Sequence, residues 1–136
     1  MYLPHHFEDT DPQAVRDIIE SCPLATLVVS ASTGLAANHI PVIADGAHAM
    51  IGHVAAANDL HRTVDDGAPV LLIFSGEDSY ISPNWYPTKP QHHQHVPTWN
   101  YQVVHIHGRI TFTRDDKALR ATVGRMTKQF ETAMNG

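Results

Sequence analysis

Ser79–Tyr101 reads SYISPNWYPTKPQHHQHVPTWNY and contains both tryptophans of the chain, three of its four tyrosines and four of its nine prolines. It lies between two runs with the composition of β-strands, Val70–Phe74 and Tyr101–Thr113. Because most connections in compact domains are short, a loop of this length needs a reason. Proline stiffens such a loop, and aromatic rings offer flat apolar faces with polar edges. The stretch therefore predicts a long loop that contacts a planar ligand or a partner surface, or else buries its rings on its own barrel.

The size and composition of the chain predict one domain spanning residues 1–136. The apolar fraction of 43% and the charged fraction of 17% are ordinary for a soluble globular protein. The formal net charge of −5 argues against a monomer that coats nucleic acid. Cys22 is the single cysteine, no apolar run approaches the roughly 20 residues of a membrane span, and the N-terminus does not read as a secretory signal. We expect a cytoplasmic protein that is not associated with a membrane.

Upstream of the long loop, the pattern alternates between strands and short helices. Thr10-Asp11-Pro12-Gln13 is a helix start, and the apolar positions that follow continue the helix to Cys22. Pro41 lies within the second expected strand, which indicates a sheet edge or a bulge. The expected strands are Leu24–Ser30, Leu35–Ile43, His48–Val54 and Val70–Phe74, with a hairpin turn at Asp45-Gly46 and a helix at Ala55–Val64. Tyr80-Ile81 either extends the last of these strands or follows it after a turn at Gly76.

Downstream of the loop, Tyr101–Thr113 shows the clearest alternation in the sequence. Val104 and Ile106 fall on one face, and His105, His107 and Arg109 fall on the other. A final helix begins at Asp115 or Asp116 and carries an apolar stripe. The chain thus has about five short strands in hairpin order and a sixth element after the loop. This pattern fits a mainly β fold, a small antiparallel barrel with flanking helices.

Three groups of residues have the composition of a binding site. Asn58 is placed to cap a helix start with Arg62 one turn on, and such an arrangement binds anions. Asn38 and His39 are neighbours on a strand, so their side chains point to opposite faces. His105 and His107 share a strand face, a spacing that metal sites use, although no carboxylate lies nearby in sequence. Nucleophile motifs, glycine-rich nucleotide loops, zinc fingers and a clear helix-turn-helix are all absent.

Several long motifs together resemble the PaiB family, the FMN-binding negative transcriptional regulators. They occur in family order and cover nearly the whole chain, although members of the family usually continue well past residue 136. The matching residues are Met1-Tyr2-x-Pro4-x-His6-Phe7, Ala37-Asn38-His39-Ile40-Pro41, Gly52-His53-Val54-Ala55-x-Ala57-Asn58, Tyr80-Ile81-Ser82-Pro83-x-Trp85-Tyr86, Val96-Pro97-Thr98-Trp99-Asn100-Tyr101 and Val104-His105.

The resemblance implies an FMN-binding split β-barrel, antiparallel and Greek-key-like, that forms a homodimer and lacks the usual C-terminal extension. It implies FMN in a groove between two protomers and a role as a negative transcriptional regulator, with DNA as a further partner. Carried over by position, the residues of the phosphate and ribityl side are Asn38, His39, His53, Asn58 and Arg62. Those of the ring side, from the same or the other protomer, are Ser82, Trp85, Tyr86, Thr98, Trp99 and Asn100.

Two other classes of function remain open from the sequence. One is a flavin-dependent oxidoreductase that uses a reduced nicotinamide, in which the cofactor supplies the chemistry. The other is a histidine-based metal or haem protein. Direct DNA binding would require Lys89, Arg109, Arg114, Lys117, Arg120 and Arg125 to gather on one face of a dimer.

Overall fold

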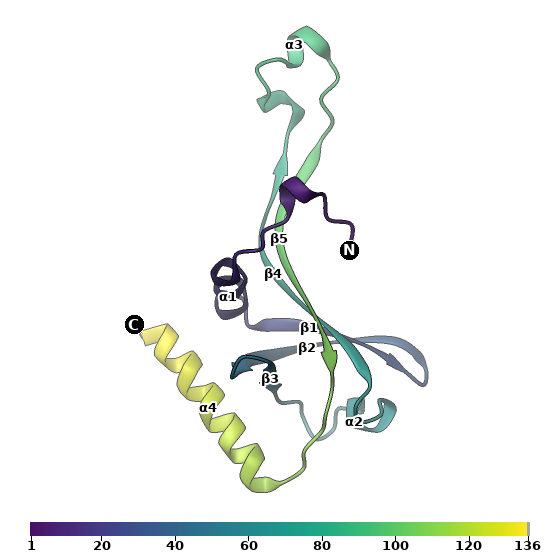
Figure 1. The fold of residues 1–136 in the computed structure, drawn as a ribbon, viewed down its shortest axis with the longest axis vertical. Helices are drawn as coiled ribbons and strands as arrows, with labels where there is room; N and C mark the ends of the chain where they lie inside the picture. The colour runs from purple at the N-terminus through teal and green to yellow at the C-terminus, as the bar shows by residue number, and fades with distance from the viewer. Residues whose placement is uncertain (136) are drawn as a thin grey trace.

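A five-stranded antiparallel sheet with flanking helices forms the protein, as Figure 1 shows for the computed structural model. The structure describes residues 1–135. The strands lie in the order β3-β2-β1-β4-β5, so β3 and β5 are the two edges. Their bounds are Leu24–Ala31 for β1, Gly34–Asp45 for β2, Ala49–Gly52 for β3, Pro69–Ile81 for β4 and Thr98–Arg109 for β5.

Residues 1–135 also form four α-helices and two short 3-10 helices. Asp11 caps the first helix by accepting a hydrogen bond from the backbone N–H of Gln13, as the helix-start pattern predicts. Asp115 likewise accepts from the N–H of Ala118 at the start of the last helix. The elements are η1 at His5–Phe7, α1 at Pro12–Ser21, α2 at Leu60–Thr63, η2 at Pro83–Trp85, α3 at Lys89–His92 and α4 at Asp116–Asn135.

The hydrophobic core covers one face of the sheet, which we call the core face. Ala25, Leu27 and Val29 alternate along β1 and are almost fully buried. Ile18 and Ile19 of α1 pack against the end of this face near Ala25, while Leu60 of α2 is buried beside Leu27 and Val29. The two helices thus cover the same side of the sheet at opposite ends of β1.

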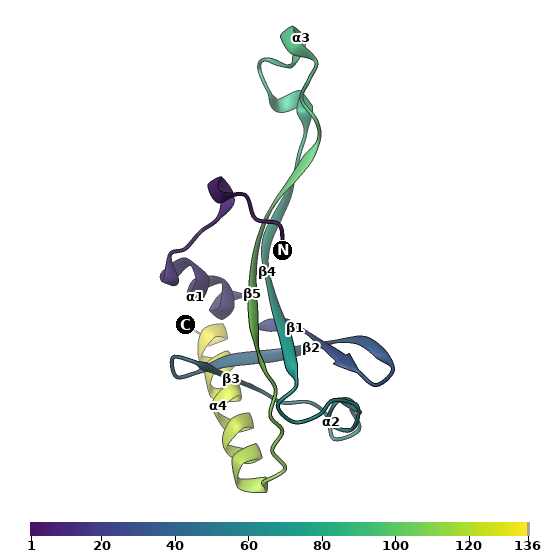
Figure 2. The same cartoon turned by 45° about the vertical axis from the view of Figure 1, so that its right-hand side comes forward.

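The predicted long loop is shorter than expected, because both of its ends are strand and only residues 82–97 lie outside β4 and β5. β4 continues to Ile81 and β5 begins at Thr98, so the chain forms a long hairpin whose outer half projects from the body with α3 at its tip (Figure 2). We call the projecting part, Ser75–Gln102, the arm. Tyr80 and Ile81 therefore belong to β4, and the described residues contain five strands rather than five plus a sixth element.

One extra residue in β4 sets the register at the base of the arm. Ser75 pairs with Val103 and Asp78 pairs with Tyr101, so three steps along β4 match two along β5. A side chain at Gly76 would have its Cβ 3.1 Å from the Cβ of Gln102, so the strands approach closely here. Because the insertion is in β4, the alternation of β5 continues unbroken from the body into the arm.

The second face of the sheet, the open face, contributes no residue to either buried cluster among residues 1–135. Cross-strand partners share a face, so the register defines it. Its residues include Thr26, Val28, His39, Leu71, Ile73, Asp78, Tyr80, Trp99, Tyr101, Val103, His105, His107 and Arg109.

Two elements are shorter than predicted, and Pro41 lies at a different kind of position. β3 is shorter than His48–Val54, and α2 is far shorter than Ala55–Val64. Pro41 lies neither at an edge nor at a bulge: β2 pairs with β1 as far as Pro41 and with β3 from Val42 onward. Proline is tolerated where the strand changes partners.

The last helix has the predicted apolar stripe, but only part of it is buried. Met126 is 1% exposed, whereas Leu119 and Val123 are exposed. Arg125 attaches the helix to the β2–β3 hairpin by donating to the Asp45 carboxylate and to the carbonyl of Ala44.

Gly52→Ala is expected to destabilise the fold by about 1–3 kcal/mol, because the new Cβ would lie 2.8 Å from the carbonyl oxygen of Pro41. Urea denaturation followed by circular dichroism measures the change. Gly124→Ala is the matched control: it meets no atom within 4 Å in mid-helix, and is expected to stabilise by about 0.5–1 kcal/mol. Equal stability of the Gly52→Ala variant and the unsubstituted chain would contradict the close approach.

Candidate functional site

Asn38 and Asn58, which are 20 residues apart in sequence, meet through their side-chain amides. Asn58 Nδ2 donates to Asn38 Oδ1 over 2.9 Å. Both are half-buried, and Asn38 lies on the core face of β2 opposite Leu27. The contact uses only part of the hydrogen-bonding capacity of each amide, since a primary amide has two donor hydrogens and an acceptor oxygen.

Asn58 also accepts the backbone N–H of Leu60, the first residue of α2, over 2.9 Å, although the N-cap position itself is Asp59 and not Asn58 as the sequence predicts. The helix itself has only four residues, so its dipole adds little to anion binding. Arg62 is exposed on it and makes no side-chain hydrogen bond to any of residues 1–135. Burial of Leu60 and Val64 in the core holds this segment in place. We call Asn38, Asn58 and Arg62 the polar corner.

His39 and His53 lie apart from the Asn38–Asn58 contact. His39 is on the open face, where its Nδ1 is 3.0 Å from the hydroxyl of Thr26 on β1. His53 follows β3 and is exposed. Of the five residues expected on the phosphate side, the structure joins two by a direct contact and places His39 on the opposite face of the sheet.

The six residues expected on the ring side all belong to the arm. Trp99 packs edge-on against Tyr80, with ring centroids 5.8 Å apart. Thr98 and Asn100 alternate with Trp99 along β5, so they point to the other, more polar side of the arm. Trp85 and Trp99 remain 64% and 58% exposed.

Contacts within the arm tip order it in spite of its exposure. Ser82 accepts the backbone N–H of Asn84 through its hydroxyl, which starts η2. The Tyr86 and His95 rings are stacked with centroids 4.5 Å apart, and His95 Nε2 lies 2.8 Å from the hydroxyl of Thr88. The sequence interpretation missed His95 and Tyr80 as supports of the predicted ring-side residues. The pairing of Tyr80 with Trp99 requires the strand register, and the stacking of His95 on Tyr86 requires the fold of the tip.

The arm tip and the polar corner lie at opposite ends of the molecule in both views (Figures 1 and 2). A single copy therefore does not bring the aromatic residues of the tip to the Asn38–Asn58 contact. A ligand that touches both groups would have to take them from two copies of the chain.

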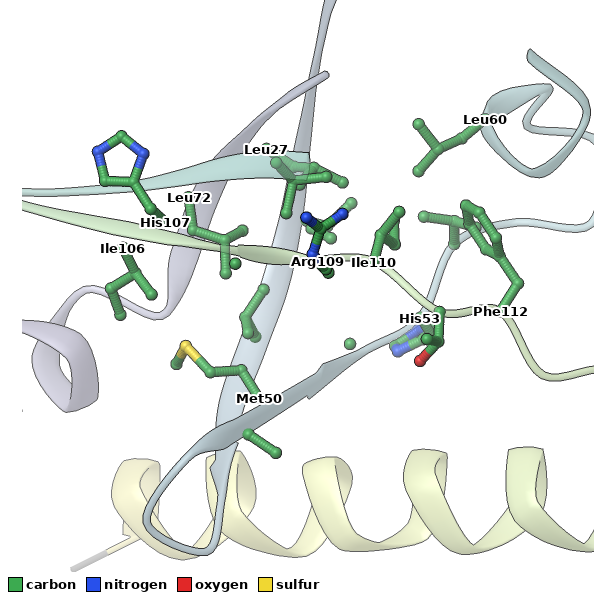
Figure 3. A pocket seen from close by; sticks show the side chains of 18 of the residues that line it. Leu27, Met50, His53, Leu60, Leu72, Ile106, His107, Arg109, Ile110 and Phe112 are labelled. Atoms are coloured by element: carbon green, nitrogen blue, oxygen red, sulfur yellow. The ribbon is translucent and has the colours of Figure 1, made fainter. Parts of the chain in front are cut away.

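A cavity of about 360 Å³ lies between the two edges of the sheet (Figure 3). Met50 reaches toward it from β3 and Ile106 from β5, while Leu60 points toward Phe112. His107 points to the opposite side of β5 from Ile106, in agreement with the strand alternation. Residues of both edge strands line the cavity, and β3 and β5 are not neighbours in the strand order.

The part of the chain that the structure describes contains no group of three or more His, Cys, Asp or Glu side chains able to hold a metal ion. His105 and His107 share a face as predicted but lack the further ligands that a metal site needs. Within residues 1–135, none of the helices has the length and apolar character of a membrane span.

With this geometry in view, comparison with known proteins defines the class. Residues 1–136 match the family described as "Putative FMN-binding domain", and the chain belongs to that family. One relative is the protease synthase and sporulation protein PAI 2 of Bacillus subtilis, which confirms the resemblance to the PaiB family. It is 31% identical over 120 residues, which are 86% of this chain and 56% of that protein.

A second relative is an uncharacterized protein of Saccharomyces cerevisiae. It is 32% identical over 139 residues, covering 86% of this chain and 82% of the yeast protein. The chain thus spans most of the yeast relative but only about half of the Bacillus one.

Asn58→Ala is expected to lower the free energy of unfolding by about 1–2 kcal/mol, because it removes both the hydrogen bond to the N–H of Leu60 at the start of α2 and the contact with Asn38. A double-mutant cycle with Asn38→Ala should give a coupling of about 0.5–1.5 kcal/mol. Urea denaturation measures both quantities, with Gln129→Ala on the exposed side of α4 as the control. Strict additivity of the two asparagine changes would mean that the amides do not interact in solution.

Proposed function

We propose that the chain is an FMN-binding protein that forms a homodimer with the FMN-binding split-barrel architecture, and that it acts as a PaiB-like negative regulator of transcription. The observation that supports an FMN site shared by two copies is the separation of the polar corner from the aromatic arm. Each group suits one end of FMN, and a second copy is needed to bring them together.

The polar corner suits the ribityl phosphate. Arg62 offers a guanidinium with no partner among residues 1–135, and the amide of Asn38 keeps donor capacity beyond its contact with Asn58. Guanidinium groups bind phosphate through charge-assisted hydrogen bonds. Of the two histidines that the resemblance adds to the phosphate and ribityl side, His53 is exposed after β3 and stays in the proposal. His39 lies on the opposite face of the sheet, so it could contribute only from a second copy.

The arm suits the isoalloxazine ring. Trp85, Tyr86 and Trp99 offer flat faces, and Ser82, Thr98 and Asn100 offer hydrogen-bonding groups beside them. Such a mixture of aromatic surface with a few polar groups is typical of small-molecule sites. FMN, when bound, would supply redox chemistry, and these residues would hold and orient its ring.

Kinship with PAI 2 of Bacillus subtilis supports the regulatory role. Of the basic residues considered for DNA binding, Arg125 is engaged by Asp45, and Arg109 donates to the carbonyl of Gly67. Lys117 and Arg120 are exposed on α4 and are the ones we assign to a nucleic-acid contact.

A gel-shift assay at low salt with upstream DNA of the host tests this role, and absence of any shift would contradict direct repression.

The FMN site is tested by titrating FMN into the purified protein and following tryptophan emission. Both tryptophans lie on the arm, so a ring bound there should quench most of the emission. Sedimentation of the same samples should show two copies per particle. Saturable FMN binding to a monomer would contradict the shared site, and unchanged emission with bound FMN would place the ring away from the arm.

Arg62→Ala is expected to weaken FMN binding by about 1–3 kcal/mol, the range of a lost hydrogen bond to a charged group. Calorimetric titration with FMN measures it, and riboflavin, which lacks the phosphate, should bind both proteins equally. Arg16→Ala is the matched control, since Arg16 on α1 donates to Gln13. Unchanged FMN affinity in Arg62→Ala would mean that the phosphate lies elsewhere.

A further inference from the structure

The contact between Asn38 and Asn58 is the second step of a series of hydrogen bonds that starts at a backbone amide. The N–H of Leu60 donates to Asn58 Oδ1 over 2.9 Å, and Asn58 Nδ2 donates to Asn38 Oδ1 over 2.9 Å. A backbone N–H can only donate, so the atom of Asn58 that faces it must be the oxygen. The nitrogen of Asn58 then faces Asn38, and the atom of Asn38 that meets it must be an oxygen. One fixed donor therefore sets the orientation of both side-chain amides.

The core of the protein holds this donor in place. Leu60 is buried in the same cluster as Leu27, and Leu27 stands opposite Asn38 in the pairing of β1 with β2. The carbonyl of Thr63 also accepts the N–H of Ser32 over 3.3 Å, which attaches the end of α2 to the turn between β1 and β2. The orientation of the two amides is therefore set before any ligand arrives.

The series leaves the nitrogen of Asn38 as its free end. Asn38 Nδ2 makes no hydrogen bond to any of residues 1–135, yet none of the buried side-chain nitrogen and oxygen atoms in that range lacks a partner. Solvent therefore reaches this nitrogen, although the residue as a whole is half-buried. Its two hydrogens are available to a ligand.

The polar corner consequently offers hydrogen-bond donors. The amide oxygens of Asn38 and Asn58 are both engaged inside the protein. Arg62 is exposed, and its guanidinium has donors but no acceptor. An ionised phosphate brings only acceptors and matches this set, whereas an ammonium group brings only hydrogens and finds no free acceptor among these three side chains.

We infer that Asn58 is a positioning residue that holds the amide of Asn38 with its nitrogen toward the ligand, and that the polar corner is thereby specific for an acceptor group such as a phosphate monoester. The inference rests on the proposed FMN site, in which the phosphate lies at this corner. Asn58 acts on the ligand through the polarity of its hydrogen bond to Asn38, in addition to the stability that the bond adds.

Two substitutions of Asn58 separate polarity from stability. Asn58→Asp has nearly the same shape and keeps an oxygen for the N–H of Leu60, but its second oxygen faces Asn38 Oδ1. The amide of Asn38 must then rotate to donate to the carboxylate, which turns its own oxygen toward the ligand. Asn58→Ala removes both hydrogen bonds and leaves Asn38 free to donate to a ligand.

Affinity and stability should therefore rank the two variants in opposite orders. In calorimetric titration with FMN, Kd should rise at least about tenfold in Asn58→Asp and no more than about threefold in Asn58→Ala, because only the former loses a hydrogen bond to a charged group. In urea denaturation, Asn58→Ala should be the less stable of the two. Riboflavin, which lacks the phosphate, should bind both variants as it binds the unsubstituted chain.

Ala57→Asp is the control for the added negative charge. Ala57 is exposed beside Asn58 and takes no part in the series of hydrogen bonds. Solvent and salt screen an exposed charge, so the Kd for FMN should rise by no more than about threefold. A loss as large as that of Asn58→Asp would mean that repulsion of the phosphate explains both results, and would overturn the inference.

Hydrogen exchange of the side-chain amides, followed by NMR, reads the orientation of Asn38 without any ligand. In the unsubstituted chain, the hydrogens on Asn58 Nδ2 should exchange more slowly than those on Asn38 Nδ2, because only Asn58 donates within the protein. In Asn58→Asp, the hydrogens of Asn38 should become slow. Fast exchange at Asn38 in that variant would show that its amide does not turn, and would overturn the inference.

The remaining outcomes separate this inference from the proposed function. Absence of FMN binding by the unsubstituted chain contradicts the proposed site, and with it the phosphate specificity of the corner. FMN binding that Asn58→Ala weakens at least as much as Asn58→Asp leaves the proposed function standing. In that case Asn58 would only stabilise the fold, and the inference would be wrong.

Discussion

The antiparallel pairing of β4 with β5 is the constraint on which the rest of the molecule depends. It joins the body to the arm, and it keeps every odd-numbered residue of β5 from Trp99 to Arg109 on one face. The extra residue beside Gly76 allows this, because it adjusts β4 and leaves β5 regular. If the insertion lay in β5 instead, the aromatic side of the arm would be on the same side of the sheet as the core and α1.

Much of the body could be predicted from the sequence because its signals are local. The helix start at Asp11 and the turn at Gly46, whose φ is 71°, depend on residues adjacent in sequence. The alternation of Val104 and Ile106 with His105 and His107 likewise gave the correct faces of β5. These features need no knowledge of distant partners.

The extent of the arm strands could not be predicted because its evidence is not local. The four prolines and three histidines do lie in the non-strand tip, residues 82–97, whereas the pairing of Tyr80 with Trp99 extends the two strands further out than their composition indicates. For the candidate site, the sequence named the residues but did not show how they are arranged in space. The amide contact of Asn38 with Asn58 agrees with two residues named from the sequence, but their separation from the arm tip appears only in the fold. Whether these residues bind FMN stays a prediction.

The arm is a two-stranded ribbon without a third strand or a helix of its own body along its outer half. Such ribbons are marginally stable in water. Its backbone amides therefore belong to the least protected part of the chain, while those of β1, bonded on both sides, belong to the most protected part. Solvent deuterium would label the ribbon first, and any molecule that settles on its aromatic side would slow that labelling.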